Sequence, residues 1–247
     1  MGKMELAYRT DRGQVRTQNE DAVLILGDEH AGIALVADGM GGHEAGEVAS
    51  ELVIEQFRRA FPTLPATPME MEQWFRDNVE LANEQVLAFS KQSNLVMMGT
   101  TIAGVCWHDE TIVIVHVGDS RVYALRDGAL HQLTEDHSYV NVLKQLGELT
   151  EEEMRVHPKR NIITRAIGSN EHVEPDLQVF AEPEFDTILI CTDGLTNHLT
   201  DEDILLVLER PISADVKADQ LINQANRLGG SDNITVAIVQ FTDRKRG

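Results

Sequence analysis

Residues 33–44, with the sequence IALVADGMGGHE, constrain the fold of this chain more than any other segment. Five apolar residues lead directly into Asp38, and this run is too short for a helix, so it predicts a buried β-strand. Three glycines follow Asp38 within four positions, and glycine allows the backbone to approach a ligand closely. Residues 45–60 have helical composition and apolar spacing. The segment therefore predicts a strand, a glycine loop and a helix, with a carboxylate at the end of the strand.

Two interpretations of Asp38 follow from this segment. A carboxylate at the end of a buried strand is a common component of a metal or phosphate site. Aspartate is also common in a tight turn before a helix, where it caps the helix. The segment alone does not separate these interpretations, so the rest of the chain has to decide between them.

The composition indicates the broad class of protein. A length of 247 residues is within the range of one large domain, so we expect residues 1–247 to form a single domain. The formal net charge of −20 argues against binding to nucleic acid or to an anionic membrane surface, both of which attract cationic patches. Such acidity favours solubility, and it also suits a protein that gathers divalent cations.

The two cysteines, Cys106 and Cys191, lie in apolar runs and are expected to be small core residues. Two cysteines are too few for a disulfide framework or a zinc site. The N-terminal residues lack the apolar core of a secretory signal, and no run approaches the ~20 apolar residues of a membrane span. We therefore expect a cytoplasmic protein with no membrane insertion.

The hydrophobic pattern predicts short strands alternating with amphipathic helices. Strands close in sequence favour antiparallel pairing, because parallel neighbours need a long crossover. Residues 136–168 are polar and helical, and we name this segment the flap. The expected strands are residues 4–9, 22–26, 31–43 with the glycine loop, 100–107, 111–117, 121–126, 173–180, 187–191 and 234–239; the expected helices are 44–61, 69–92, 137–146, a short helix capped by Thr150, 200–209 and 214–228.

Asp38, Asp193 and Asp232 share one description. Each flanks an apolar strand, each has a glycine or a small polar neighbour, and each comes from a distant part of the chain. If the strands belong to one core, their ends can converge. Converging carboxylates would repel one another and raise their pKa values, and a bound cation would remove that penalty. Ligands that are all oxygen suit Mg²⁺ or Mn²⁺ better than zinc, and Asp119 in the turn GDSR adds another carboxylate.

The order of the motifs resembles a known family. Each motif alone is weak, but five in order, with matching strand and helix context, resemble the metal-dependent serine/threonine protein phosphatases, the PPM or type 2C family. The similarity spans residues 5–241, and its closest variety resembles the compact bacterial phosphatases that oppose Hanks-type kinases. The motifs are RTQNED at residues 16–21, VADGMGGH at 36–43, GDSR at 118–121, TDGL at 192–195 and SDN at 231–233.

The resemblance implies an α+β fold, a four-layer α-β-β-α sandwich in which helix pairs flank two antiparallel β-sheets. It places helices 44–61 and 69–92 on one outer face and helices 200–209 and 214–228 on the other.

The resemblance also implies a role for each motif residue. The implied metal ligands are Asp38, which bridges two ions; Gly39, through its carbonyl; Asp193 and Asp232, on the second ion; Glu20, through water, with Asp21 beside it; and Asp119, on a third, weaker ion. The resemblance assigns Arg16 to phosphate binding and His43 to the general acid. Judged without the resemblance, Arg16 reads as a surface charge, and His43 as a capping or solvent-exposed residue.

The implied activity is that of a phosphoric monoester hydrolase. A hydroxide that bridges two Mg²⁺ or Mn²⁺ ions would attack phosphoserine or phosphothreonine directly and so reverse the action of a bacterial kinase. The expected partners are phosphoproteins and that kinase, and the expected state is a monomer. Two alternatives remain: a non-catalytic relative that binds phosphoproteins, and a regulatory phosphatase acting on an anti-sigma antagonist.

The flap is expected to gate substrate access with its basic residues, Lys144, Lys159, Arg160 and Arg165.

Overall fold

Two antiparallel β-sheets stack face to face in the computed structural model, which describes residues 4–41, 45–95 and 97–242. The first sheet has the spatial order β1 (Met4–Asp11), β11 (Ile234–Phe241), β10 (Thr187–Cys191), β7 (Arg121–Arg126) and β8 (Ala129–Gln132). The second has the order β2 (Asp21–Gly27), β3 (Ala31–Met40), β5 (Ile102–His108), β6 (Thr111–Val117) and β9 (Asp176–Ala181), and β4 (Gly99–Thr100) also pairs with β3.

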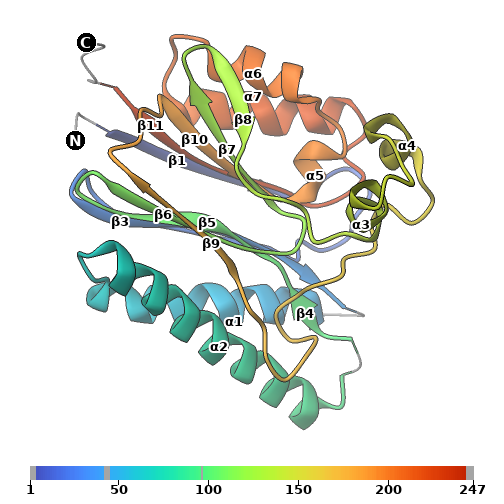
Figure 1. Ribbon diagram of the computed structural model, residues 1–247. Helices are drawn as coiled ribbons and strands as arrows, with labels where there is room; N and C mark the ends of the chain where they lie inside the picture. Colours follow the sequence, from blue (N-terminus) through green and yellow to red (C-terminus); the bar gives the residue numbers. More distant parts are fainter. Residues whose placement is uncertain (1–3, 42–44, 96, 243–247) are drawn as a thin grey trace.

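Helices cover both outer faces of this sandwich (Figure 1). The second sheet is covered by α1 (Ala45–Ala60) and α2 (Pro68–Ser93), which are joined through the 3₁₀ turn η1 (Phe61–Thr63). The first sheet is covered by α6 (Asp201–Leu208) and α7 (Ala214–Arg227). The short helices α3 (Tyr139–Gln145), α4 (Glu151–Val156) and α5 (Asp193–Thr196) lie together at one end of the sandwich, on the right in Figure 1. The predicted α+β, four-layer α-β-β-α sandwich is confirmed.

Alternation along the strands builds three apolar layers. In β3, Leu35 packs toward α1 and α2, and its neighbour Val36 packs between the two sheets. This period of two explains why the strand reads as a continuous apolar run, since both of its faces are buried. Phe57 and Phe75 fill the layer beneath the second sheet. Burying each large apolar side chain contributes about 1.5–3 kcal/mol, so these layers supply the main favourable term in folding.

The structure extends β3 beyond the predicted strand end. Gly39 pairs with Thr100 and Met40 with Gly99, so the strand continues through Met40 because β4 supplies a partner. Asp38 therefore lies inside a strand, and its interpretation as a helix-capping turn residue is wrong. The glycine loop was predicted to begin at Gly39, so its first two residues belong to the strand instead. Residues 42–44, which hold the rest of the predicted loop and the predicted helix start, lie outside the described residues.

Other boundaries differ by a few residues. The first flap helix begins at Tyr139 instead of residue 137, because the Ser138 side chain accepts the Asn141 N–H and caps it. The predicted Thr150 cap forms a complete capping box with Glu153. The pattern did not indicate β8 or α5, which are both four residues long and too short for periodicity to show.

Both cysteines are buried, as predicted. Within the described ranges, none of the helices combines the length and the apolarity that a membrane span requires.

Candidate functional site

The antiparallel pairing brings five acidic residues to the end of the sandwich that carries α3 and α5. Asp21 begins β2 and lies opposite Asp38 of β3 in the register. Asp193 follows β10, Asp119 follows β6 and Asp232 precedes β11. Because neighbouring strands run in opposite directions, the end of one strand and the start of the next lie on the same side of the sandwich. The acidic residues occur at those strand ends.

Hydrogen bonds from Thr100 of β4 and from Thr101, between β4 and β5, fix the backbone that carries Asp38. The Asp38 N–H donates to Thr101 Oγ1 at 2.9 Å. The Asp38 carbonyl oxygen accepts from the Thr101 N–H at 2.9 Å and from the Thr100 hydroxyl at 2.8 Å. The backbone at Asp38 is therefore anchored to the neighbouring strand, which leaves its carboxyl group for other partners.

Two buried carboxyl groups in the cluster, those of Asp21 and Asp193, are incompletely paired. The Thr192 hydroxyl, after β10, donates to Asp21 Oδ2 at 2.9 Å across the two sheets. The Asn197 side chain donates to Asp193 Oδ2 at 3.0 Å. Asp21 Oδ1 and Asp193 Oδ1 are buried and have no hydrogen-bond partner among the described residues. An unpaired buried polar atom costs about 1–3 kcal/mol, so these two oxygens suit the binding of a cation.

Burial and mutual repulsion raise the pKa values of the clustered carboxyl groups. Burial raises the pKa of Asp21 to about 7. Burial, and then the charges of Asp21 and Asp193, raise the pKa of Asp38 well above its usual range. The pKa values of Asp119 and Asp193 are also raised, first by burial and then by neighbouring carboxylates. A divalent cation would reverse this penalty. The carboxylate oxygens suit a hard cation such as Mg²⁺ or Mn²⁺, so the site fits the metal that the resemblance implies.

Among the described residues, no three acidic side chains of this cluster bring their ligand atoms within 4.8 Å of one another. In the described part of the chain, one group of three metal-ligating side chains has all its ligand atoms within 4.8 Å of one another, and that group is His116, His137 and Asp176. The acidic residues do not form such a compact group. A wider arrangement is expected when ligands are divided between two ions about 3.5–4 Å apart.

Glycine is required at position 39 by close packing. A Cβ atom at Gly39 would overlap the carbonyl oxygens of Gly46 and Glu20. The Gly39 N–H donates to that Glu20 carbonyl at 3.1 Å, and the Ser50 hydroxyl of α1 donates to the same oxygen at 2.6 Å. The loop before β2, the strand β3 and the first turns of α1 are thus packed together at the site.

Arg16 is held at the edge of the acidic cluster. Its Nη2 atom forms an ion pair with Asp232 Oδ2 at 2.7 Å, and about half of its side chain is exposed. Burial raises the pKa of the nearby Glu20, and the Arg16 charge opposes that rise. Arg16 is a cation that faces the site, and its guanidinium group offers further N–H donors to a bound anion.

Asn233 shapes the loop that carries Arg16 and Glu20, a role that sequence reasoning left unassigned. Its side-chain oxygen accepts the Glu20 N–H at 2.8 Å, and its amide group donates to the carbonyl oxygens of Arg12 at 2.9 Å and Gln18 at 2.8 Å. Thr192 was also missed as the residue that pairs with Asp21. Both residues stand next to a predicted ligand in sequence, which is the one signal that could have identified them.

The structure gathers most of the predicted site residues. The residues brought to this end are Arg16, Glu20, Asp21, Asp38, Gly39, Asp119, Asp193 and Asp232. His43, the predicted general acid, lies outside the described residues. The individual roles of all these residues stay predictions.

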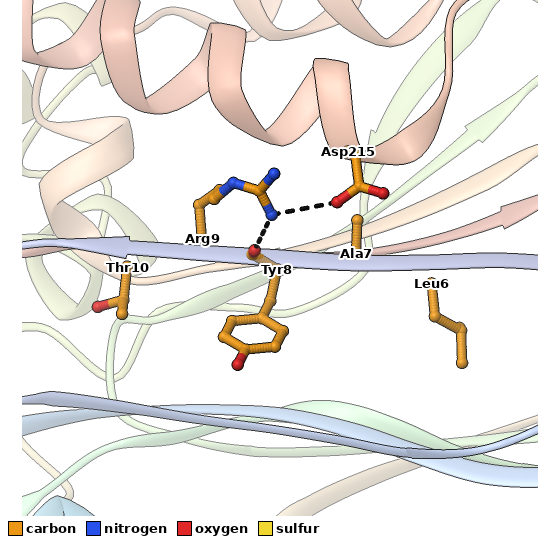
Figure 2. A pocket seen from close by; sticks show the side chains of 6 residues that line it. All are labelled: Leu6, Ala7, Tyr8, Arg9, Thr10 and Asp215. Atoms are coloured by element: carbon orange, nitrogen blue, oxygen red, sulfur yellow. Dashed lines mark hydrogen bonds and ion pairs between the residues drawn. The ribbon is translucent and has the colours of Figure 1, made fainter.

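A separate groove lies along the edge strand β1. It is lined by residues 6–10 and Asp215, and Figure 2 shows Arg9 between β1 and the helix that carries Asp215. The Arg9 guanidinium group donates to the Tyr8 carbonyl oxygen at 2.7 Å and to Asp215 at 3.1 Å. Arg9 therefore satisfies an edge carbonyl of the sheet, and the groove contains none of the clustered carboxylates.

Comparisons with known proteins connect this arrangement to one family. The model of the family described as protein phosphatase 2C matches residues 10–226. The serine/threonine phosphatase stp of Listeria welshimeri is 40% identical over 248 residues, which cover 99% of this chain and 98% of that protein.

Two solved structures agree with this finding. The serine/threonine phosphatase of S. agalactiae superimposes with a TM-score of 0.91 at 40% identity, covering 97% of this chain and 100% of that one. The catalytic domain of the phosphatase PstP, solved in complex with two manganese ions, has a TM-score of 0.88 at 36% identity, covering 98% of this chain and 100% of that one.

Proposed function

The chain belongs to the protein phosphatase 2C family and is a serine/threonine protein phosphatase, and from this premise we propose that it uses two divalent ions to hydrolyse phosphoserine and phosphothreonine in proteins. The family and the manganese-bound PstP structure support a site for two metal ions. The observation that carries the proposal is the convergence of carboxyl groups with raised pKa values and two unpaired buried oxygens.

We propose that this chain's own residues divide into ligands and substrate contacts. Asp38 would contact both ions, with the Gly39 carbonyl beside it, and Asp193 and Asp232 would complete the second ion's ligands. Glu20 and Asp21, at the start of β2, would contribute further oxygen ligands, with Glu20 acting through water. Asp119 would hold a third, weaker ion. When bound, the ions supply water with a pKa low enough to ionise near neutral pH.

Arg16 and His43 are proposed to act on the substrate. Arg16 would orient the phosphate through the N–H donors that Asp232 leaves free, and the Asp232 ion pair would hold the guanidinium group in place. His43 would give a proton to the leaving serine or threonine oxygen. The flap, with its basic residues, would contact the protein part of the substrate.

We propose that the substrates are products of a bacterial serine/threonine kinase. Because such a kinase needs ATP, the two activities would meet in the cytoplasm. We also propose that residues 1–247 act as one domain and as a monomer. Phosphoproteomics of a strain that lacks the protein would identify the substrates.

The central experiment measures hydrolysis of a phosphothreonine peptide with Mn²⁺, with Mg²⁺ and after EDTA treatment. We expect activity with metal and none after EDTA. Asp38→Asn and Asp193→Asn should abolish turnover while circular dichroism shows a folded protein. Activity that persists in EDTA would refute the metal mechanism, and full activity in either variant would refute the ligand assignment.

The same preparation separates the alternative functions. Calorimetric metal binding without turnover would favour a non-catalytic phosphoprotein-binding protein. The regulatory alternative, a phosphatase for an anti-sigma antagonist, also predicts turnover, so it is tested by identifying proteins trapped on the Asp38→Asn variant.

A further inference from the structure

The two ends of the flap meet at His137. The Thr164 N–H, near the end of the flap, donates to the His137 carbonyl oxygen at 2.7 Å. Ser138 and Ile163 form an isolated antiparallel bridge beside it. His137 therefore lies where the flap leaves and rejoins the sandwich.

His137 also holds Gly118, the residue before Asp119, on both of its peptide groups. The His137 N–H donates to the Gly118 carbonyl oxygen at 2.7 Å. In the opposite direction, the Gly118 N–H donates to His137 Nδ1 at 3.0 Å. Gly118 has a φ of +115°, a conformation that glycine adopts readily because it has no Cβ atom. Because the backbone has two soft torsions per residue, fixing both peptide groups sets the direction in which the chain enters Asp119.

The ring of His137 is committed to hydrogen bonds. Because Nδ1 accepts the Gly118 N–H, the neutral ring carries its proton on Nε2. Nε2 lies 3.0 Å from Asp176 Oδ2 and donates to it. Asp176 Oδ1 accepts from Arg165 Nη1 at 2.5 Å. Burial lowers the pKa of His137, which keeps the ring neutral. A continuous set of contacts thus joins Arg165, near the end of the flap, to Gly118.

This tautomer argues against a metal ion among His116, His137 and Asp176, although their ligand atoms lie within 4.8 Å of one another. A metal ion on Nε2 needs the lone pair that the proton occupies, and moving the proton to Nδ1 would oppose it to the Gly118 N–H. The His116 ring instead packs against His137 at a tilt of 36°, with ring centroids 4.6 Å apart, and only 1% of His116 is exposed. Its ring excludes water from one side of the His137 contacts.

Asp136, the flap residue before His137, holds the other end of the turn formed by residues 118–121. Arg121 Nε donates to Asp136 Oδ1 at 2.8 Å, and Arg121 Nη2 donates to Asp136 Oδ2 at 2.7 Å. Such a bidentate pair fixes orientation as well as distance. Asp136 and His137, which are consecutive, therefore hold both ends of the turn formed by residues 118–121.

We propose that His137 is a positioning residue that orients Asp119 for metal binding through Gly118. It thereby couples the start of the flap to the weak metal site. This inference rests on the proposed metal role of Asp119. A ligand's orienting partners typically change metal affinity about 10- to 100-fold. Loss of the Gly118 contact is therefore expected to weaken the site at Asp119 and to leave the ions at Asp38 in place.

Two substitutions separate the two ring contacts. In His137→Asn, the side-chain oxygen can occupy the position of Nδ1 and accept the Gly118 N–H, but the contact with Asp176 is lost. In His137→Gln, the side-chain amide can reach the position of Nε2 and donate to Asp176, but the Gly118 contact is lost. His157→Ala, which changes another flap histidine whose Nδ1 accepts a backbone N–H, is the matched control.

The first measurement is hydrogen exchange of the Gly118 amide by NMR in the metal-free protein. We expect protection in the wild-type protein, His137→Asn and His157→Ala, and at least about 10-fold faster exchange in His137→Gln. Equal protection in all four proteins would overturn the proposed hold on Gly118. Because this measurement needs no metal and no turnover, its result is independent of the proposed phosphatase mechanism.

The second measurement is calorimetric titration with Mn²⁺ alone. We expect Asp119→Asn to remove a weak binding phase and His137→Gln to weaken that phase about 10-fold, with His137→Asn within about 2-fold of wild type. A weak phase unchanged in His137→Gln would overturn the coupling. A weak phase unchanged in Asp119→Asn would overturn both the ligand role of Asp119 and the inference built on it. A wild-type protein that shows no binding phase would overturn the proposed metal site itself.

Discussion

Replacing Asp21 by asparagine should stabilise the metal-free protein. Burial raises the pKa of Asp21 from 3.8 to about 7, because the ionised carboxylate loses water and faces Asp193 and Asp232. Each pKa unit corresponds to about 1.4 kcal/mol, so ionising Asp21 in the folded protein costs up to about 4 kcal/mol at pH 8. Asparagine removes the charge, keeps the volume and retains an oxygen to accept the Thr192 hydroxyl.

The pH dependence gives this prediction its sharpest form. Because the folded-state pKa of Asp21 lies above its unfolded value, the contribution of Asp21 to the stability of the wild-type protein falls as the pH rises from about 4 to about 7. The asparagine side chain of the variant does not titrate. The advantage of Asp21→Asn should therefore be about 4 kcal/mol at pH 8, about 3 kcal/mol at pH 6 and less than about 1 kcal/mol at pH 4.

The assay is urea unfolding in EDTA at these three pH values, followed by circular dichroism. Asp77→Asn, at an exposed position on α2, removes one charge as a control and should change the stability by less than about 0.5 kcal/mol. A gain in stability that is constant with pH, or no gain at pH 8, would refute the electrostatic account of the cluster. Added Mn²⁺ should stabilise the wild-type protein more than the variant, because bound cations offset the repulsion at Asp21.

Three further predictions test other parts of the site. Arg16→Lys should raise KM for a phosphopeptide about 10-fold with little loss of stability, because the half-exposed guanidinium group loses its planar donors; unchanged steady-state kinetics would contradict its phosphate role. Gly39→Ala should lower the free energy of unfolding by about 1–3 kcal/mol, since its Cβ would overlap backbone oxygens, and an unchanged Tm would contradict that packing. Burial lowers the pKa of His116 from 6.5 to about 4, so the wild-type protein should lose about 3 kcal/mol relative to His116→Gln as the pH falls from 6.5 to 4. Parallel stability curves for these two proteins would show that His116 does not titrate in this way.

Local pattern was sufficient for most of the elements. Apolar runs bounded by glycine and turn residues predicted β3, β5, β6, β10 and β11, because their two-sided burial requires continuous apolar sequence. The long helices followed from apolar spacing, because each buries one face against a sheet. The four-residue elements β8 and α5 were missed because their stability comes from neighbours in the fold. The order of five weak motifs then predicted the family, which the comparisons confirm.

The residue types at the strand ends can be predicted from the sequence, because the requirement for an apolar strand, a glycine and a carboxylate is local. Which of these residues face one another depends on the packing of the sheets and cannot be predicted from local pattern. Asp21 meets Asp38 through strand register, and Thr192 reaches Asp21 across two sheets from 171 residues away. His137 holds Gly118 because the flap returns to the turn beside β6. Such contacts depend on how whole layers pack, and proximity between distant segments leaves no periodic trace in either segment alone.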